Sequence, residues 1–289
     1  IYADGEIVMG DSQSGEIGDN FAREIAKVRK DSTVKAVVLR VNSPGGAVFA
    51  AEQIKAELDL LKAQKPLVAS YGNYAASGGY WISGNCDKIF SNATTLTGSI
   101  GVFGVVPDLS GTINRKFHVN VVSVNSNKHS DMMNLMRPMD KDEYALQQKS
   151  VDDIYDRFVD IVSEGRGLDP QYVDSIAQGR VWTGAEAFRI GLVDELGTLE
   201  DAVQWARIAA SDSENVSGQN DFDVVGYPAP LTVIEQITEM FGGAQARVNP
   251  FAGTPLETAG KTILEWTEQW DKSNGTTYVA SMPFEMLNK

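Results

Sequence analysis

The sequence predicts an α/β fold in which βαβ units bring parallel strands into one sheet. Two apolar runs, Ala36–Val41 and Leu67–Tyr71, have the length and composition of buried strands, and a turn of small residues follows each. The segment between them, Ala47–Lys65, has helical composition, with aliphatic residues spaced for one face. A right-handed crossover would set the two strands parallel. Both turns should then lie at the same carboxyl edge of the sheet, where open α/β sheets place their sites.

The segments on either side of this unit extend the same pattern. Ile1–Met9 is predicted to be a first strand, and Asn20–Lys30 an amphipathic helix. Lys88–Asn92 is predicted to be a further short strand, and Thr94–Gly104 is a segment rich in Thr, Ser and Gly.

A run of helices follows, and most of them carry recognisable start signals. Asp140–Glu164 begins with a capping box, because Asp140 stands three residues before Glu143. Asp169 followed by Pro170 opens a second helix. Two more helices are predicted at residues 183–191 and 198–210.

Composition changes after residue 210, which divides the chain into a main domain, 1–210, and a C-terminal extension, 211–289. Residues 211–221 have the composition of an exposed linker. A short strand at 222–226 and two helices at 231–241 and 256–270 are expected next, so the extension is predicted to be mainly helical. Its apolar residues indicate packing on the main domain or on a neighbour in an assembly.

The overall composition excludes several classes of function. The chain has 289 residues, a net charge of −14 and a pI near 4.6, which argue against nucleic acid and against direct docking on anionic lipid. Two histidines and one cysteine are too few and too poorly spaced for a zinc or calcium cluster, so no metal or cofactor is expected. Cys86 is expected to be a small core residue. No run reaches the length of a membrane span, and no signal peptide precedes Ile1.

The turn after Leu67–Tyr71 contains the candidate nucleophile, Ser77. Alanines precede this serine and glycines follow it, so its backbone is open to approach, and a helix is predicted to start there. Free N–H groups at a helix start favour negative charge, which suits a nucleophile. The alternative is that Ser77 only caps the helix. The turn at Asn42–Gly46 adds glycine amides, and a hydroxyl facing such amides is the minimum for acyl transfer.

Three motifs, Asn42–Gly46, Ala75–Trp81 and Thr97–Gly101, resemble those of the signal peptide peptidase A (protease IV) family. The likeness runs from about residue 1 to residue 210. The family comprises serine proteases of the Clp protease/crotonase fold. The resemblance therefore implies that Ser77 is the nucleophile.

The same resemblance assigns the residues around the nucleophile. The amides of Gly46 and Gly78 are implied to form the oxyanion hole, and Gly45, Gly98 and Ser99 to line the substrate groove. Amides of the segment that contains Gly98 and Ser99 are expected to pair with an extended peptide by strand addition, or else to form only a tight turn.

The general base of the family is a lysine, and this sequence has no lysine at the corresponding position. In short members this lysine lies in a loop after a strand that corresponds to Val119–Val124, and the alignment puts Ser130 at its position. Long members are tandem repeats whose N-terminal repeat supplies the lysine. The chain therefore resembles the C-terminal half of a long member. Lys128, two residues off register, and His129 are the alternatives for a base within the chain.

The predicted function is a serine endopeptidase that degrades cleaved signal peptides and other apolar peptides by a Ser/Lys dyad. The resemblance implies a peptide substrate, the N-terminal repeat as partner, self-association into rings, and attachment of the parent protein to the bacterial inner membrane on its periplasmic side. Two alternatives stay open. One is a catalytically silent peptide-binding or assembly module. The other is acyl-CoA chemistry of the crotonase type, which is disfavoured because no acid pair is evident.

Overall fold

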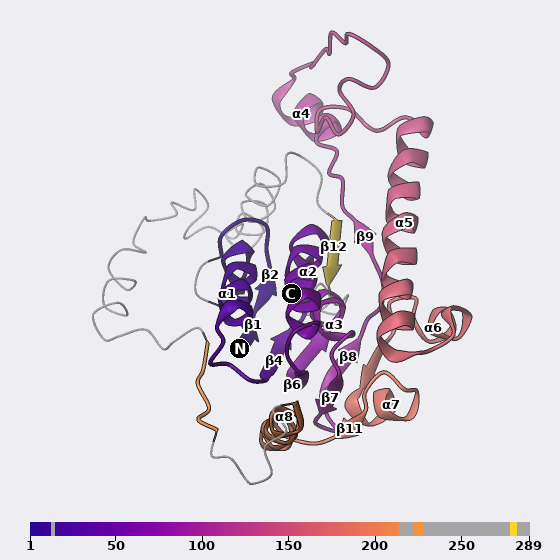
Figure 1. Cartoon of the computed structure of the whole chain (residues 1–289). Coiled ribbons are helices and arrows are strands. Elements are labelled where there is room, and N and C mark those ends of the chain that lie inside the picture. The colour runs from indigo at the N-terminus through magenta and orange to yellow at the C-terminus, as the bar shows by residue number, and fades with distance from the viewer. Residues whose placement is uncertain (13–14, 214–221, 228–277, 282–289) are drawn as a thin grey trace, which may run out of the picture.

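The computed structural model describes residues 1–12, 15–213, 222–227 and 278–281 (Figure 1). A parallel sheet forms the centre of this structure, in the order β1-β4-β6-β7-β11. Its strands are β1 (Tyr2–Asp4), β4 (Val37–Ser43), β6 (Leu67–Ala76), β7 (Lys88–Ser91) and β11 (Glu195–Leu196). The pairing of β4 with β6 is parallel, from Val37 opposite Leu67 to Val41 opposite Tyr71. The predicted α/β class and the predicted parallel pairing of these two strands are therefore confirmed.

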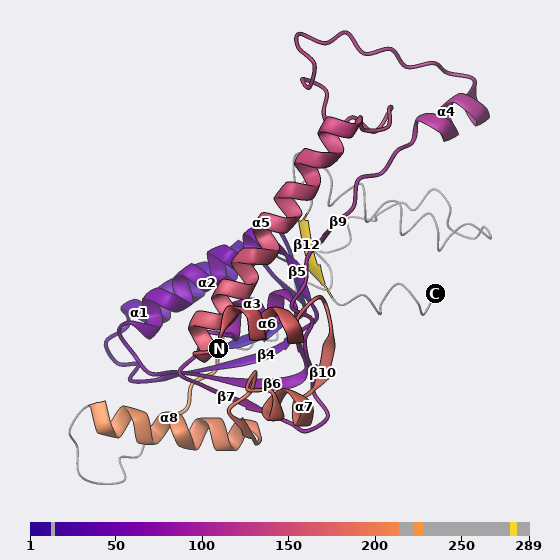
Figure 2. The same cartoon turned by 90° about the vertical axis from the view of Figure 1, so that its right-hand side faces the viewer.

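Helices cover both faces of this sheet, as the turned view in Figure 2 shows. Helices α1 (Asp19–Lys30), α2 (Val48–Lys62) and α3 (Gly78–Ser83) lie on one face, and α8 (Leu199–Ser213) lies on the other. Alternate residues of β4 are buried, because each strand residue points to the opposite face from its neighbour. On the α8 side, Val68 and Phe90 pack with Ala202 and Ala206 in a cluster of their own.

A second sheet lies next to the carboxyl ends of these strands, in the order β3-β2-β5-β12-β9. It consists of β2 (Glu6–Ile7), β3 (Glu16–Ile17), β5 (Gly45–Ala47), β9 (Phe103–Gly104) and β12 (Tyr278–Ser281). The expected single strand Ile1–Met9 is divided between the two sheets at Gly5, which has a φ of 112°. Because β12 comes from the C-terminal extension, part of that extension belongs to a sheet with the main domain.

The C-terminal helices of the main domain begin where their caps predict. Helix α5 (Lys141–Arg166) has a complete capping box between Asp140 and Glu143. Helix α6 (Pro170–Ile176) is capped by Asp169, and α7 (Gly184–Arg189) by Thr183. Strand β10 (Val181–Thr183) pairs antiparallel with β8 (Leu96–Gly98), which itself pairs parallel with β6.

Residues 105–140, called the arm below, project from the body together with the N-terminal half of α5 (Figures 1 and 2). The arm contains α4 (Ser110–Phe117). The predicted strand Val119–Val124 is wrong: it is not in a sheet, and Val124 is 98% exposed. The family resemblance assigned a strand to this segment, but a strand forms only where a neighbouring strand takes up its backbone hydrogen bonds.

The C-terminal extension gives a mixed outcome. The predicted strand at 222–226 is wrong, since these residues form no strand pairing and run beside α8 and the sheet. The predicted helices at 231–241 and 256–270 lie outside the described residues. Within the described part of the chain, no helix is both long and apolar enough to cross a membrane.

Candidate active site

Ser77 is held in a strained backbone conformation at the point where β6 ends and α3 begins. Its φ of 53° and ψ of −117° lie outside the regions that side-chain-bearing residues favour, which costs on the order of 1–3 kcal/mol. Two hydrogen bonds hold this conformation: the Ser77 N–H donates to the Gly98 carbonyl at 2.8 Å, and the Ser77 carbonyl accepts from the Trp81 N–H at 2.8 Å. A sharp strand-to-helix turn of this kind is a recurrent way to present a nucleophilic serine.

The Ser77 side chain is fully buried, and its Oγ has no hydrogen-bond partner in the part of the chain described. Serine at a helix start normally uses its hydroxyl to cap the first turn, but here no side-chain capping bond is present. The alternative that Ser77 serves only as a cap therefore fails. A buried hydroxyl without a hydrogen-bond partner lowers the stability of the fold. Such a group therefore calls for an explanation, and a catalytic role is one of the recognised ones.

Gly46 and Gly78, whose amides are expected to form the oxyanion hole, are in contact with each other. A Cβ built on Gly78 would lie 3.1 Å from the Gly46 amide nitrogen and 3.1 Å from the Gly45 Cα. Gly46 itself has a φ of 150°, and a Cβ there would come within 1.9 Å of the Ile7 carbonyl oxygen. Only glycine can occupy position 46, because any side chain would overlap the backbone of β2. The crowding brings β5 against the start of α3.

Helix α3 is anchored on all sides, which fixes the position of Ser77. The Trp81 Nε1 donates to the Glu52 carboxylate at 2.8 Å, and its ring packs on Phe158 of α5 at a centroid distance of 4.7 Å. The Tyr80 hydroxyl donates to the Leu192 carbonyl at 2.7 Å. Burial raises the pKa of the Tyr80 hydroxyl. Sequence patterns did not predict these contacts, since the residues come from three helices, α2, α3 and α5, and from the loop after α7.

Gly98 and Ser99 lie close to the nucleophile, but their contacts in this structure are with the protein. The Gly98 carbonyl accepts from Ser77, and a Cβ on Gly98 would lie 2.9 Å from the Trp182 ring. The Ser99 N–H donates to the Arg180 carbonyl at 2.7 Å, and Ser99 has a φ of 48°. Both residues therefore belong to the turn that holds the Ser77 backbone in place. Their role toward a substrate stays a prediction.

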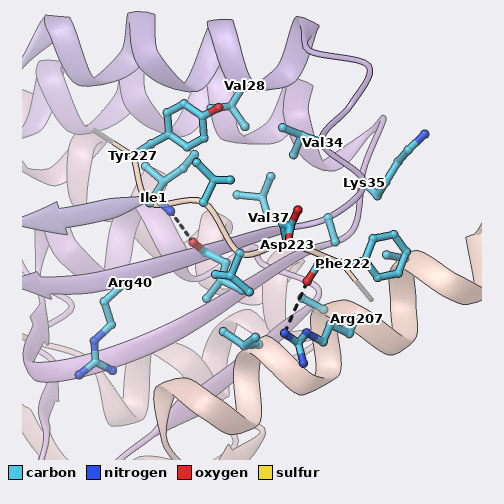
Figure 3. Close-up of a pocket in the computed structure, with 18 of the residues that line it drawn as sticks. Ile1, Val28, Val34, Lys35, Val37, Arg40, Arg207, Phe222, Asp223 and Tyr227 are labelled. Atoms are coloured by element: carbon cyan, nitrogen blue, oxygen red, sulfur yellow. Dashed lines mark hydrogen bonds between the residues drawn. The ribbon is translucent and has the colours of Figure 1, made fainter. Parts of the chain in front are cut away.

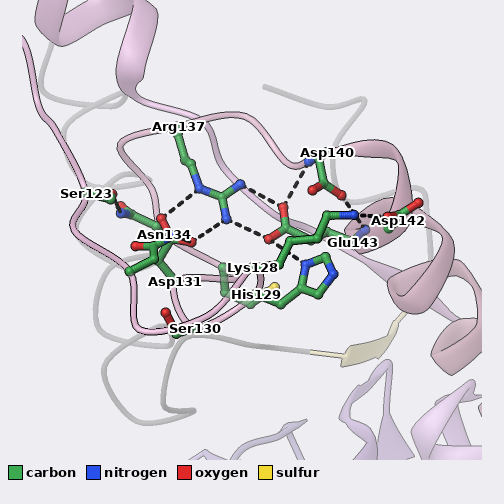
Figure 4. A network of polar contacts seen from close by, with 12 residues as sticks. Ser123, Lys128, His129, Ser130, Asp131, Asn134, Arg137, Asp140, Asp142 and Glu143 are labelled. Atoms are coloured by element: carbon green, nitrogen blue, oxygen red, sulfur yellow. Dashed lines mark hydrogen bonds and ion pairs between the residues drawn. The ribbon is translucent and has the colours of Figure 1, made fainter.

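The loop expected to supply a base belongs to a polar network at the junction of the arm and α5 (Figure 4). Arg137 forms its centre and binds the carboxylates of Asp131 and Glu143, with N–O distances of 2.6 to 2.8 Å. Glu143 also accepts from the Asp140 N–H at 2.9 Å. Hydrogen bonds from Arg137 lower the pKa of the Glu143 carboxyl to about 2. This network fixes the start of α5.

Neither alternative base within the chain is placed like a catalytic group. Lys128 is exposed and pairs with Asp142, whose hydrogen bond raises the pKa of the Lys128 ammonium. A lysine acts as a base only when its pKa is lowered, so the structure argues against this role. His129 has its Nδ1 3.5 Å from the Glu143 carboxylate. Ser130 lies in the same loop and bonds to the Asn127 carbonyl.

One group of three potential metal ligands comes together among the described residues: His129, Asp140 and Glu143. Both oxygens of the Glu143 carboxylate already accept hydrogen bonds from Arg137. The group therefore has its charge balanced by an arginine, and its geometry is explained by the helix cap. We assign it a structural role.

A cavity of about 610 Å³ lies between the sheet, α8 and residues 222–227 (Figure 3). It is lined by the amino-terminal part of β4, including Val37 and Val38, and by Arg207 and Phe222. Ser77 follows the carboxyl end of β6, at the opposite edge of the parallel sheet, where α/β folds place their sites. The cavity is therefore separate from the candidate active site.

Comparisons with known proteins give one matching family model and several relatives. Residues 59–212 match the model of "Peptidase family S49". The chain is 41% identical to Protease 4 of Haemophilus influenzae over 259 residues, covering 88% of this chain and 42% of that protein. It is 39% identical to a protein of Enterococcus faecium provisionally named signal peptide peptidase SppA, covering 64% of this chain and 54% of that one. The chain thus spans about two-fifths to one-half of the length of these relatives.

Among solved structures, ClpP1 from Listeria monocytogenes is similar with a TM-score of 0.44 and 14% identity. The match covers 70% of this chain and 92% of that one.

Proposed function

Because the chain belongs to peptidase family S49, we propose that it carries the nucleophile of a serine endopeptidase acting on apolar peptides such as cleaved signal peptides. The observation that carries this proposal is the environment of Ser77: its turn is strained, its buried Oγ has no partner among the described residues, and Gly46 and Gly78 are in contact beside it. The names of the relatives, Protease 4 and signal peptide peptidase SppA, support peptide hydrolysis as the reaction.

In the proposed reaction, an extended peptide lies along β5 with the carbonyl to be cleaved above Ser77. The Ser77 Oγ attacks the carbonyl carbon while a lysine amine takes up the hydroxyl proton. The amides of Gly46 and Gly78 stabilise the oxyanion, and the proton passes from the lysine to the leaving amine. Water then attacks the acyl-enzyme, with the same lysine as base, and releases the second product.

We assign the lysine to an N-terminal repeat outside this chain. Two observations support the assignment. The described residues give the Ser77 Oγ no hydrogen-bond partner, and the pKa of the Lys128 ammonium is raised, whereas a general base needs a lowered pKa. The relatives are also much longer than this chain, which leaves room for a second repeat.

The arm is the surface we assign to that repeat. Its apolar side chains include Phe117, Val122 and Val124, which are 70%, 83% and 98% exposed. Apolar surface of this kind marks an interaction site. Self-association of the complete protein, and its attachment to the bacterial inner membrane on the periplasmic side, are proposed by the same family resemblance.

The test is covalent labelling of Ser77 by a fluorophosphonate probe. The chain alone and the chain mixed with the N-terminal repeat are compared, each with a Ser77→Ala control and a Lys128→Ala variant. We expect labelling in the mixture only, unchanged by Lys128→Ala. Equal labelling of the chain alone would place the base within these residues. No labelling in either sample, with the two repeats shown to associate, would reject the protease proposal.

A peptide-binding module without catalysis is the second candidate. It is favoured by one observation, the antiparallel strand that already pairs with the edge of β5. Peptide binding by the Ser77→Ala variant together with an absence of labelling in the mixture would support it.

A further inference from the structure

Strand β6 departs from regular pairing shortly before the nucleophile. Its register with β4 is continuous up to Tyr71 and resumes at Ala75. Between these positions β4 contributes a single residue, Asn42, whereas β6 contributes residues 72–74, called the bulge below. Bulges change the direction of the strand that carries them and are over-represented next to active sites. Ser77 follows directly after this irregular end of β6.

The side chain of Asn42 takes up the backbone groups that the interrupted pairing leaves open. Its Oδ1 accepts from the N–H of Asn73 at 3.1 Å and from the N–H of Tyr74 at 3.3 Å. Its Nδ2 donates to the Asp4 carboxylate of β1 at 2.8 Å. The reversed amide would turn its NH₂ toward two N–H donors and its oxygen toward a carboxylate, so only one orientation satisfies every partner.

Strand β8 holds the opposite side of the bulge. The Thr95 Oγ1 donates to the Gly72 carbonyl at 2.6 Å, and the Thr97 Oγ1 donates to the Ala75 carbonyl at 2.6 Å. Both threonines are buried. Side chains of β4 and β8 therefore fix the end of β6 from both sides, where the strand ladder alone does not.

The backbone of Asn42 connects the same point to the oxyanion glycine. Its carbonyl accepts from the Gly5 N–H at 3.0 Å, at the bend where β1 passes into β2. Ile7 of β2 is the register partner of Gly46, and its backbone lies against that glycine. Asn42 thus contacts both the segment that leads to the nucleophile and the segment that supports Gly46.

We infer that Asn42 is a positioning residue of this site: its side-chain amide sets the path of the bulge and thereby the place of the Ser77 Oγ relative to Gly46. The inference rests on the proposed function only for the identity of the nucleophile. Asn42 acts through the backbone of β6, so it is not a catalytic residue. A misplacement of a reacting group by about 1 Å can lower a rate on the order of a hundredfold.

An exchange of two side chains tests this role. Asn42→Asp removes the donor and sets two carboxylates face to face. The double variant Asp4→Asn with Asn42→Asp restores a donor and an acceptor, with the direction of the hydrogen bond reversed. Asn42→Ala removes the acceptor of the bulge altogether. Asn85→Ala is the matched control, because Asn85 is also half-buried and its side chain donates to Asp59 at 2.9 Å, beyond the far end of α3.

The first readout is fluorophosphonate labelling of Ser77 in the chain mixed with the N-terminal repeat, measured over a range of probe concentrations. We expect Asn42→Ala and Asn42→Asp to lower the limiting rate constant about tenfold to a hundredfold, with little change in the affinity for the probe. The double variant should label within about threefold of the wild type. Asn85→Ala should label at the wild-type rate, although both alanine variants should lower Tm by similar amounts. Equal rates for the two alanine variants, or no recovery in the double variant, would overturn the inference.

The second readout needs no reaction. The ¹H–¹⁵N resonances of the Ser77 and Gly78 amides in the chain alone report the geometry of the turn. We expect Asn42→Ala to shift both resonances, the double variant to return them toward the wild-type positions, and Asn85→Ala to leave them unchanged. Unchanged resonances in Asn42→Ala would overturn the inference whether or not the protein labels. A wild-type mixture that fails to label would reject the proposed function, and the resonances would still decide whether Asn42 positions Ser77.

Discussion

Replacing Gly78 by alanine tests whether the contact between β5 and α3 builds the oxyanion site. The new Cβ would lie 3.1 Å from the Gly46 amide nitrogen and 3.2 Å from the Ile7 side chain. These separations are too short by a few tenths of an ångström, so β5 and α3 must move apart. Overpacking of this size costs about 1–3 kcal/mol of folding free energy. The fold should survive, but the two amides should no longer converge on one point.

The expected loss of reactivity follows from the value of an oxyanion donor. Removing one donor completely costs on the order of 10²–10³ in rate. Displacing the pair without removing it should cost about tenfold to a hundredfold. The assay is the rate constant for fluorophosphonate labelling of Ser77 in the chain mixed with the N-terminal repeat. Thermal unfolding of the same samples should show a fall in Tm of about 2–10 °C.

Gly84→Ala is the matched control, because it introduces similar crowding at the other end of α3. A Cβ there would lie 3.1 Å from the Tyr80 carbonyl oxygen, and Gly84 has helical dihedral angles. This variant should label at close to the wild-type rate. If Gly78→Ala labels as fast as Gly84→Ala, the amides of Gly46 and Gly78 do not form the oxyanion site, and the reasoning from their proximity is refuted.

Three further predictions concern stability and accessibility. Phe158 is fully buried and packs on Trp81. Phe158→Ala should therefore lower the free energy of unfolding, measured in urea, by about 3–5 kcal/mol. A loss below about 1 kcal/mol would contradict this packing. Glu143→Gln removes the charge that pairs with Arg137, so amides of the arm should exchange hydrogen faster than in the wild type at neutral pH. The pKa of the Glu143 carboxyl is lowered from 4.5 to about 2 in the folded chain. Its contribution to folding stability is therefore complete above pH 4.5 and is lost as the pH falls toward 2. The difference in amide hydrogen-exchange protection of the arm between variant and wild type should therefore shrink as the pH falls from 4.5 to 2. A difference that stays constant over this range would argue against the ion pair with Arg137. Cys86, with its thiol pKa raised to about 12, should react with a thiol reagent at pH 8 only as fast as the chain unfolds, and rapid reaction of the native protein would disprove its burial.

Local patterns were reliable where a short stretch of chain contains the whole interaction. The capping box at Asp140, the helix start at Thr183 and the proline start at Pro170 are such cases, and all three helices begin there. The βαβ unit around α2 was also predictable, since apolar runs and helical spacing are properties of neighbouring residues. Strand predictions failed at Val119–Val124 and at residues 222–226, because a strand depends on a partner that composition does not reveal.

The sequence by itself predicted the strand–helix–strand order that leads to Ser77 and the small residues on both sides of this serine. The family motifs also pointed to Ser77, Gly46 and Gly78, whereas the reason for glycine at position 46, its contact with the Ile7 backbone, came from the structure. Only the tertiary structure decided that Gly46 and Gly78 touch, that Lys128 pairs with an aspartate, and that Tyr278–Ser281 lies against β5. These contacts join residues far apart in the chain. They depend on how the elements pack and which strand edges remain open, and neither property is encoded in a local pattern.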